Sequence, residues 1–247
     1  MIQIVKDPAP VNLVRSNKRQ LAILLTKYAA GIRTFDFTGA YRSEAVKLAL
    51  RNNQFNKCCF SEAKFTGDDS HVEHYRPKGQ VDEWPAGAVY TPGYYWLAYE
   101  WANLFLCKST INSSYKRNFF PLVDEAQRNR SHHDTNIEVP LLVNPAIDNP
   151  RNHIKFVGDE PVGITDQGKC TIELLFLRAP EFEEARRLRL KILKMLKASV
   201  EKALKAGYDV NEPHVADIIS ELKAYVLPHS EFSSMAIDFL SGWPHLQ

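Results

Sequence analysis

The sequence has few cysteines, no long apolar stretch and no strong excess of charge of one sign. Only 4 of its 247 residues are cysteine, which is too few for the disulfide scaffold of a small secreted protein. No uninterrupted apolar run approaches the roughly 18 residues that a membrane helix needs, so we expect no membrane span. The first residues lack the apolar stretch of a secretory signal. Together these absences predict a protein of the reducing cytoplasm.

The charge balance says little about partners. The formal net charge is only +2, from 31 basic and 29 acidic residues. Hydrophobic residues make up 45% and charged residues 24% of the chain, close to the average of globular proteins. This composition excludes a disordered tail, a collagen-like fibre and a low-complexity array.

Apolar residues recur at helical spacing near both ends of the chain. The predicted helices cover residues 17–31, 42–53, 181–206, 213–226 and 230–241. Short β-prone pieces at 153–157 and 162–165 predict a hairpin. Residues 81–93, with two prolines and two glycines, predict a loop.

We therefore expect an α+β fold, mainly helical, in three parts. The parts are an N-terminal helical segment (1–56), a central core (57–122), and a small hairpin followed by a C-terminal helical region (123–247). The aromatic cluster at 94–101 is expected to belong to the core rather than to a base-stacking surface.

The residues that could carry chemistry lie in the central part. Glu73 stands directly before His74, Asn103 precedes an apolar strand, and Asn112 lies four residues before Lys116 in a predicted helix. This pattern resembles the HNH nuclease family, whose core is a ββα-metal motif: a two-stranded hairpin packed on a helix, with one divalent metal ion between them.

The resemblance implies a role for each of these side chains. His74 would be the general base, since a histidine takes a proton from water near neutral pH. Glu73 and Asn112 would be the metal ligands, because carboxylate and amide oxygens suit Mg²⁺ or Mn²⁺. Asn103 would hold the loop that carries His74. Neighbouring strand residues point to opposite faces, so Glu73 and His74 are expected at a strand end.

Four further side chains are candidates for contact with substrate: Lys116, Arg76, Lys78 and His71. The segment 57–118 carries no net charge, so a basic surround must come from elsewhere. The helix at 181–205, with eight basic and four acidic residues, or a partner protein is expected to supply it.

Several blocks are more specific than the core motif. EHYRPKG, YYWLAYEWANL, NSSYKRNFFPL, PLLVNP and EFSSMAIDFL resemble the PtuB nuclease subunits of Septu-type and retron-associated anti-phage defence systems. The resemblance covers roughly residues 57–240. It implies an endonuclease acting on DNA or RNA, with a PtuA-like ATPase as partner. In retron-associated systems it also implies association with a reverse transcriptase and its RNA–DNA product.

One feature departs from that family. Its members usually hold a structural zinc ion with two C-x-x-C pairs, which here fall on Cys58 and Ser61 and on Lys108 and Ile111. Only one of these is a zinc ligand, so we expect no structural zinc. Packing is expected to replace it, with the candidates Phe60, Leu106, Ile111 and Phe119. The departure leaves an alternative open: a catalytically inactive HNH-like scaffold or a nucleic-acid-binding subunit.

Overall fold

The computed structural model describes residues 1–67 and 69–246, and it combines helices with small sheets in an α+β fold. The helices are α1 (Val11–Ala29), α2 (Glu44–Asn53), α3 (Asp166–Leu174), α4 (Pro180–Lys205), α5 (Pro213–Tyr225) and α6 (Ser233–Phe239). The strands are β1 (Ser70–His74), β2 (Val81–Asp82), β3 (Val89–Tyr90), β4 (Leu104–Lys108), β5 (Ile154–Val157) and β6 (Glu160–Gly163).

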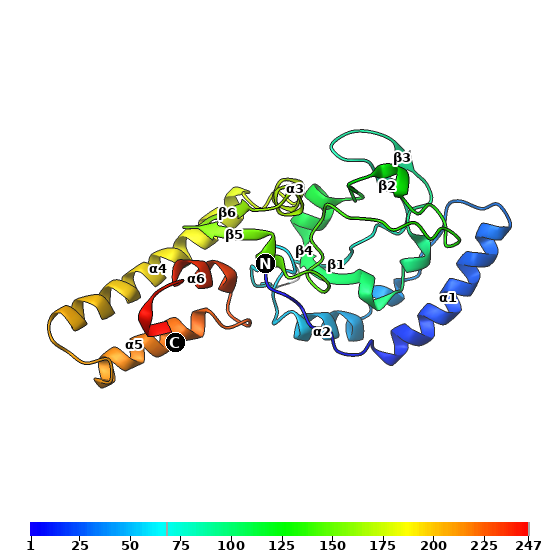
Figure 1. Cartoon of the computed structure of the whole chain (residues 1–247). Coiled ribbons are helices and arrows are strands. Elements are labelled where there is room, and N and C mark those ends of the chain that lie inside the picture. Colours follow the sequence, from blue (N-terminus) through cyan, green and yellow to red (C-terminus); the bar gives the residue numbers. More distant parts are fainter. Residues whose placement is uncertain (68, 247) are drawn as a thin grey trace.

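The strands form three antiparallel pairs, β1 with β4, β2 with β3 and β5 with β6. The molecule is elongated, with α1 near one end, α4 to α6 at the other, and the β1–β4 pair between them (Figure 1). In the described part of the chain, no helix combines the length and apolarity needed to cross a membrane.

Most of the predicted elements are present. All five predicted helices form, although α1 begins at Val11, well before residue 17, and the predicted hairpin is the β5–β6 pair. The prediction of a loop at 81–93 is wrong in one respect, because this segment contains the β2–β3 pair. Each of those strands has only two residues, too few for an alternating pattern to be visible in the sequence.

Two apolar cores divide the chain. The larger core joins the N-terminal segment to β1, β4 and α3, and it includes Leu13, Val46 and Phe105. The smaller core lies among α4, α5 and α6 and includes Leu193 and Met235. The N-terminal segment therefore shares a core with the central part, and the domain boundaries expected at 56 and 122 remain a prediction.

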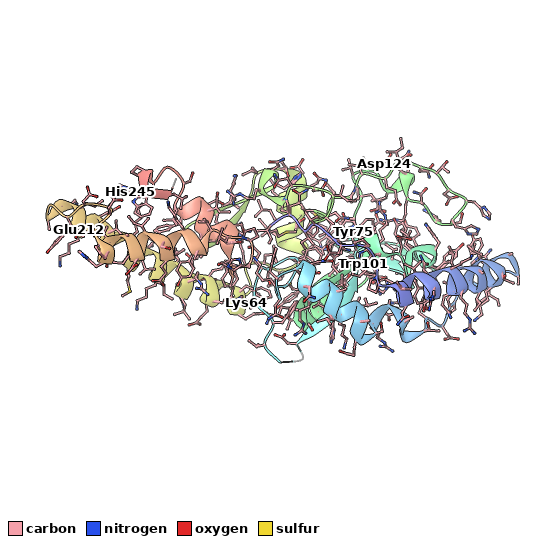
Figure 2. All side chains as sticks on the ribbon, turned by 90° about the horizontal axis from the view of Figure 1, so that it is seen from below. Lys64, Tyr75, Trp101, Asp124, Glu212 and His245 are labelled. Atoms are coloured by element: carbon pink, nitrogen blue, oxygen red, sulfur yellow. The ribbon has the colours of Figure 1, made fainter. Side chains whose placement is uncertain are left out.

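The aromatic cluster at 94–101 contributes to the larger core. Tyr94, Tyr95 and Tyr99 are each at most 2% exposed, and the Tyr94 ring meets Phe120 edge-on at 5.5 Å. Figure 2 shows Trp101 and Tyr75 in the middle of the molecule, far from Glu212 and His245 at the helical end. The tyrosines of this cluster are thus packed inside, as expected.

A buried charge cluster joins the two cores. The Glu62 carboxylate is paired with the amino group of Met1 at 2.8 Å and with the ammonium of Lys57 at 3.2 Å. It also accepts hydrogen bonds from the hydroxyls of Ser233, at 3.0 Å, and Ser234, which lie at the start of α6. The pKa of Glu62 is lowered, because these two cations and the hydroxyl donors outweigh the desolvation that alone would raise it.

Candidate functional site

The β1–β4 pair and the short helix after it form the frame of the site. Glu73 lies opposite Phe105 and His74 opposite Leu104 in the antiparallel register. A helix of π type, Ile111–Lys116, begins three residues after β4. His74 is the last residue of β1, so the chain leaves the regular strand directly after it. His74 thus lies at the strand end, as expected, with Glu73 one residue before it.

A single cavity of about 990 Å³ lies against this frame. Glu73, His74 and Asn112 all line it, as do His71 and Lys78. The structure therefore brings together side chains from β1, from the loop after it and from the helix after β4. Glu73 and His74 are only 3% and 5% exposed, so little of either residue meets solvent.

The imidazole of His74 is held in one tautomer by the backbone. Its Nε2 lies 2.9 Å from the carbonyl oxygen of Ala98, and because a carbonyl only accepts, Nε2 must carry the proton. Nδ1 then carries the lone pair, and it accepts a hydrogen bond from the ammonium of Lys78 at 3.4 Å. The ring of Tyr41 packs edge-on against the imidazole at 4.6 Å.

The surroundings keep His74 neutral. Burial lowers the pKa of the imidazole well below its ordinary value of 6.5, and the nearby charge of Lys78 lowers it further. Lys78 is itself affected, since burial lowers the pKa of its ammonium to about 8. At neutral pH, His74 is therefore an unprotonated base whose lone pair is on Nδ1.

Asn103 holds the backbone that follows His74. Its side-chain oxygen accepts a hydrogen bond from the N–H of Arg76 at 2.7 Å. Its amide group donates to the carbonyls of Arg76 at 3.0 Å and Leu97 at 3.1 Å. The Asn103 carbonyl in turn accepts from the N–H of Tyr75 at 2.9 Å. These contacts fix the backbone at Arg76 and Leu97, and the positioning role expected of Asn103 remains a prediction.

Glu73 is paired inside the protein with Lys116. The ammonium of Lys116 lies 2.6 Å from Oε1 of Glu73 and donates to the carbonyl of His74 at 2.9 Å. Burial raises the pKa of Glu73, and the charge of Lys116 only partly opposes that effect. Lys116 is fully buried, so in this arrangement its ammonium contacts the site from within and does not meet a phosphate in the cavity.

Within the described residues 1–67 and 69–246, no three His, Cys, Asp or Glu side chains gather as a metal site, so a cation here would rely on few protein ligands. Glu73 offers a carboxylate, and the side chain of Asn112 lines the same cavity; among the described residues none forms a hydrogen bond with that side chain. Mg²⁺ binds to proteins through one or two carboxylates and keeps several waters or substrate phosphate oxygens as further ligands. Glu73 and Asn112 fit this pattern, and the cation role assigned to them remains a prediction.

Three cationic residues around the cavity were not expected from the sequence. Arg42 and Lys47 come from the N-terminal segment, and Arg117 follows the π helix. With Lys78 they give four cations among the residues that line the cavity, against the single carboxylate of Glu73. Two of the four cations thus come from the N-terminal segment and two from the central part, and no residue of α4 lines the cavity.

Of the other residues expected to contact substrate, two line the cavity and one does not. His71 is exposed and lines the cavity, and Lys78 lies beside the imidazole of His74. Arg76 lies elsewhere: its Nε is 3.1 Å from a carboxylate oxygen of Glu138, and its guanidinium stacks over Phe120. Among the described residues Arg76 does not line the cavity.

The positions of the family's zinc ligands form a compact hydrogen-bonded turn. The thiol of Cys58 accepts the N–H groups of Ser61 at 3.5 Å and Lys108 at 3.4 Å. Burial alone would raise the pKa of this thiol, but hydrogen bonds from Cys59, Ser61 and Lys108 lower it to about 6. Three of the expected packing residues are fully buried here, namely Phe60, Leu106 and Ile111, while Phe119 is half-buried. The absence of a structural zinc ion remains a prediction.

Comparison with known proteins decides the family. The chain is 31% identical over 211 residues to the Septu protein PtuB of Bacillus mycoides (strain KBAB4), a match that covers 81% of this chain and 70% of that protein. The chain belongs to the PtuB family of Septu proteins. A second PtuB, from Bacillus thuringiensis, is 24% identical over 204 residues, covering 79% of this chain and 68% of the relative. No protein-family model matches the chain.

This result confirms the resemblance to PtuB seen in the sequence blocks. A match over 81% of the chain extends well beyond the short segment that carries Glu73, His74, Asn103 and Asn112. The PtuB family therefore shares more with this chain than a local nuclease-like pattern.

Proposed function

We propose that this PtuB-family protein is an HNH-type endonuclease that hydrolyses phosphodiester bonds of nucleic acid with the help of a divalent metal ion, Mg²⁺ or Mn²⁺. The observation that carries the proposal is the state of His74. A buried, neutral imidazole whose Nε2 is fixed by the Ala98 carbonyl presents Nδ1 at a cavity with four cationic side chains. That arrangement suits a base that activates water beside a phosphate.

Each part of the site has a task in this reaction. His74 takes a proton from the attacking water at Nδ1, and Asn103 keeps the backbone around His74 in place through the Arg76 and Leu97 bonds. Arg42 and Lys78 attract and orient the phosphate backbone by charge. A metal ion at Glu73 and Asn112 would act as a Lewis acid and stabilise the leaving oxygen.

We further propose that the protein works within a defence complex. The family name places its relatives in Septu systems. By extension, the partner of this chain is a PtuA-like ATPase, and in retron-associated systems also a reverse transcriptase with its RNA–DNA product. The positive cavity supports a polyanionic substrate, whether DNA or RNA.

The experiment is a cleavage assay on mixed DNA and RNA with Mg²⁺ or Mn²⁺, using the protein purified with its ATPase partner. His74→Ala should lower the cleavage rate by about 10²- to 10⁴-fold, the usual loss on removing a general base. His214→Ala is the matched control, because His214 is exposed on α5 and contacts only Tyr208 among the rings. Unchanged cleavage by the folded His74→Ala protein would refute the proposal.

The second candidate function is a subunit that binds nucleic acid or a partner without cleaving. One observation favours it: the Glu73 carboxylate already has a cationic partner, the buried ammonium of Lys116 at 2.6 Å. This candidate predicts that millimolar Mn²⁺ neither binds nor supports cleavage, while nucleic-acid binding survives Glu73→Gln. Isothermal titration with Mn²⁺ separates the two functions.

A further inference from the structure

Lys116 is held among oxygen atoms of the kind that bind metal ions. Its ammonium lies 2.6 Å from the Glu73 carboxylate and 2.9 Å from the carbonyl of His74. Carboxylate and carbonyl oxygens are the ligands that hard divalent cations prefer. Lys116 follows Asn112 by four residues on the π helix, which is about one turn. Its side chain therefore lies on the side of the helix that faces Glu73.

We infer that the ammonium of Lys116 occupies the cation position at Glu73 in the resting protein, and that a divalent metal ion binds there only by displacing it. This inference rests on the proposed function and concerns the control of the same site. Lys116 thereby acts as a tethered competitor, because its side chain is always present next to the carboxylate that the metal ion needs.

The displaced ammonium requires a new anionic partner. Lys116 has no exposed surface and Glu73 is only 3% exposed, so separating them leaves a buried ammonium without its counter-charge, a state that is strongly unfavourable. A nucleic-acid phosphate in the neighbouring cavity supplies the missing negative charge. Metal binding and nucleic-acid binding are then positively coupled, and the coupling is reciprocal.

Such coupling gives the site a resting state. Without nucleic acid, Glu73 and Lys116 satisfy one another and metal affinity is low. With a phosphate backbone in place, Lys116 moves to the phosphate and Glu73 is released for the metal ion. The cavity's four cationic lining residues favour entry of the polyanion first.

The test measures Mn²⁺ affinity by isothermal titration and by the electron paramagnetic resonance of free Mn²⁺, in protein without nucleic acid. Lys116→Met should bind Mn²⁺ at least tenfold more tightly than the wild type. Lys78→Met is the matched control, because it removes a positive charge from the same cavity without touching the Glu73 carboxylate. We expect its affinity to rise less than threefold.

A second comparison uses a single-stranded oligonucleotide with non-hydrolysable phosphorothioate linkages. It should raise the Mn²⁺ affinity of the wild type several-fold and leave that of Lys116→Met almost unchanged. Equal Mn²⁺ affinities for Lys116→Met and Lys78→Met would overturn the inference.

Removing Lys116 can unfold the protein, because Glu73 then stays buried without a partner. The wild type labelled with ¹⁵N-lysine covers this case: Mg²⁺ should shift the Lys116 ammonium signal, assigned with Lys116→Arg, as the metal site fills. A site that fills while this signal stays constant contradicts the inference.

Glu73→Gln separates failure of this inference from failure of the proposed function. If Glu73→Gln loses Mn²⁺ binding but Lys116→Met binds no more tightly than the control, the metal site stands and the role of Lys116 is wrong. If neither substitution changes Mn²⁺ binding, the metal ion does not bind at Glu73, and both proposals fail.

Discussion

Two buried carboxylates only eleven positions apart in the chain differ sharply in their surroundings. Glu62 and Glu73 are 2% and 3% exposed. Glu62 meets two cations and two serine hydroxyls, and its pKa is lowered. Glu73 meets the single ammonium of Lys116 inside the protein, and its pKa is raised. The first carboxylate has two cationic partners and two hydroxyl donors, and the second has one cationic partner.

This difference separates a structural charge from one that is suited to function. Folding stabilises the ionised form of Glu62, which ties the large core to α6 through Ser233 and Ser234. Folding opposes ionisation of Glu73, which lines a cavity together with the neutral imidazole of His74. A buried carboxylate beside a cavity, with its pKa shifted by desolvation and a specific charge partner, is a candidate functional group.

The largest expected effect concerns catalysis. Glu73→Gln should lower the rate of metal-dependent cleavage on the order of a thousandfold, about 4 kcal/mol of transition-state stabilisation, because the amide is a much weaker metal ligand. Glu62→Gln, measured at a temperature where it is folded, should stay within about threefold of the wild type, since Glu62 does not line the cavity that holds the reacting groups. Single-turnover cleavage assays check both. A comparable loss in Glu62→Gln would erase the distinction between the two sites.

The second expected effect concerns stability, and here the larger change is expected at Glu62 rather than at Glu73. Glu62→Gln should lower the free energy of unfolding by about 3–5 kcal/mol, because the Met1 amino group and Lys57 are left buried without their counter-charge. The double substitution Glu73→Leu/Lys116→Met removes the whole ion pair and should change stability by about 1 kcal/mol or less. Urea denaturation followed by circular dichroism measures both. The comparison fails if the double variant is the less stable of the two.

The sequence predicts the frame of the site better than its walls. The helices could be predicted because apolar periodicity is a local signal. Glu73, His74, Asn103 and Asn112 could be grouped only because their pattern resembles that of the HNH family, whose core is a strand pair packed on a helix. The β2–β3 pair could not be predicted, because two residues show no alternation.

The walls of the cavity depend on contacts between distant segments. Tyr41 and Arg42 reach the site because the N-terminal segment packs onto the central core, and no local pattern marks that packing. The direction of Lys116 also depends on packing. Its spacing from Asn112 places both on one side of the helix, but only the fold shows that the ammonium ends on Glu73 inside the protein.

A smaller effect is expected on nucleic-acid binding, where a basic residue at the Glu73 cavity is compared with one on α4. Arg42→Glu, on the wall of the Glu73 cavity, should weaken nucleic-acid binding by about tenfold and reduce the salt slope of the binding constant by about 1 or more. Lys191→Glu is the matched charge reversal on the exposed face of α4, in the region that Glu62 holds in place, and should have little effect. Fluorescence anisotropy at several salt concentrations measures both. Stronger weakening by Lys191→Glu would move the nucleic-acid surface to the C-terminal helices.

The smallest effect is a pH dependence whose sign differs between the two carboxylates. The pKa of Glu62 is lowered from its ordinary value of 4.5, so the stability that its charge provides is present above pH 4.5 and is lost as the pH falls below it. The pKa of Glu73 is raised from 4.5, so the folded state binds the proton more tightly, and stability is lost as the pH rises from 4.5 through the higher folded pKa. Each slope is at most about 1.4 kcal/mol per pH unit.

Urea unfolding from pH 4 to 7 measures the two slopes. Relative to Glu62→Gln, the wild type should lose stability toward the acid end. Relative to Glu73→Gln, the wild type should gain stability there. Slopes of the same sign for the two variants would mean that Lys116 offsets the burial of the Glu73 charge as fully as the Met1 amino group and Lys57 offset that of Glu62. Glu73 would then have no distinguishing feature of a metal ligand.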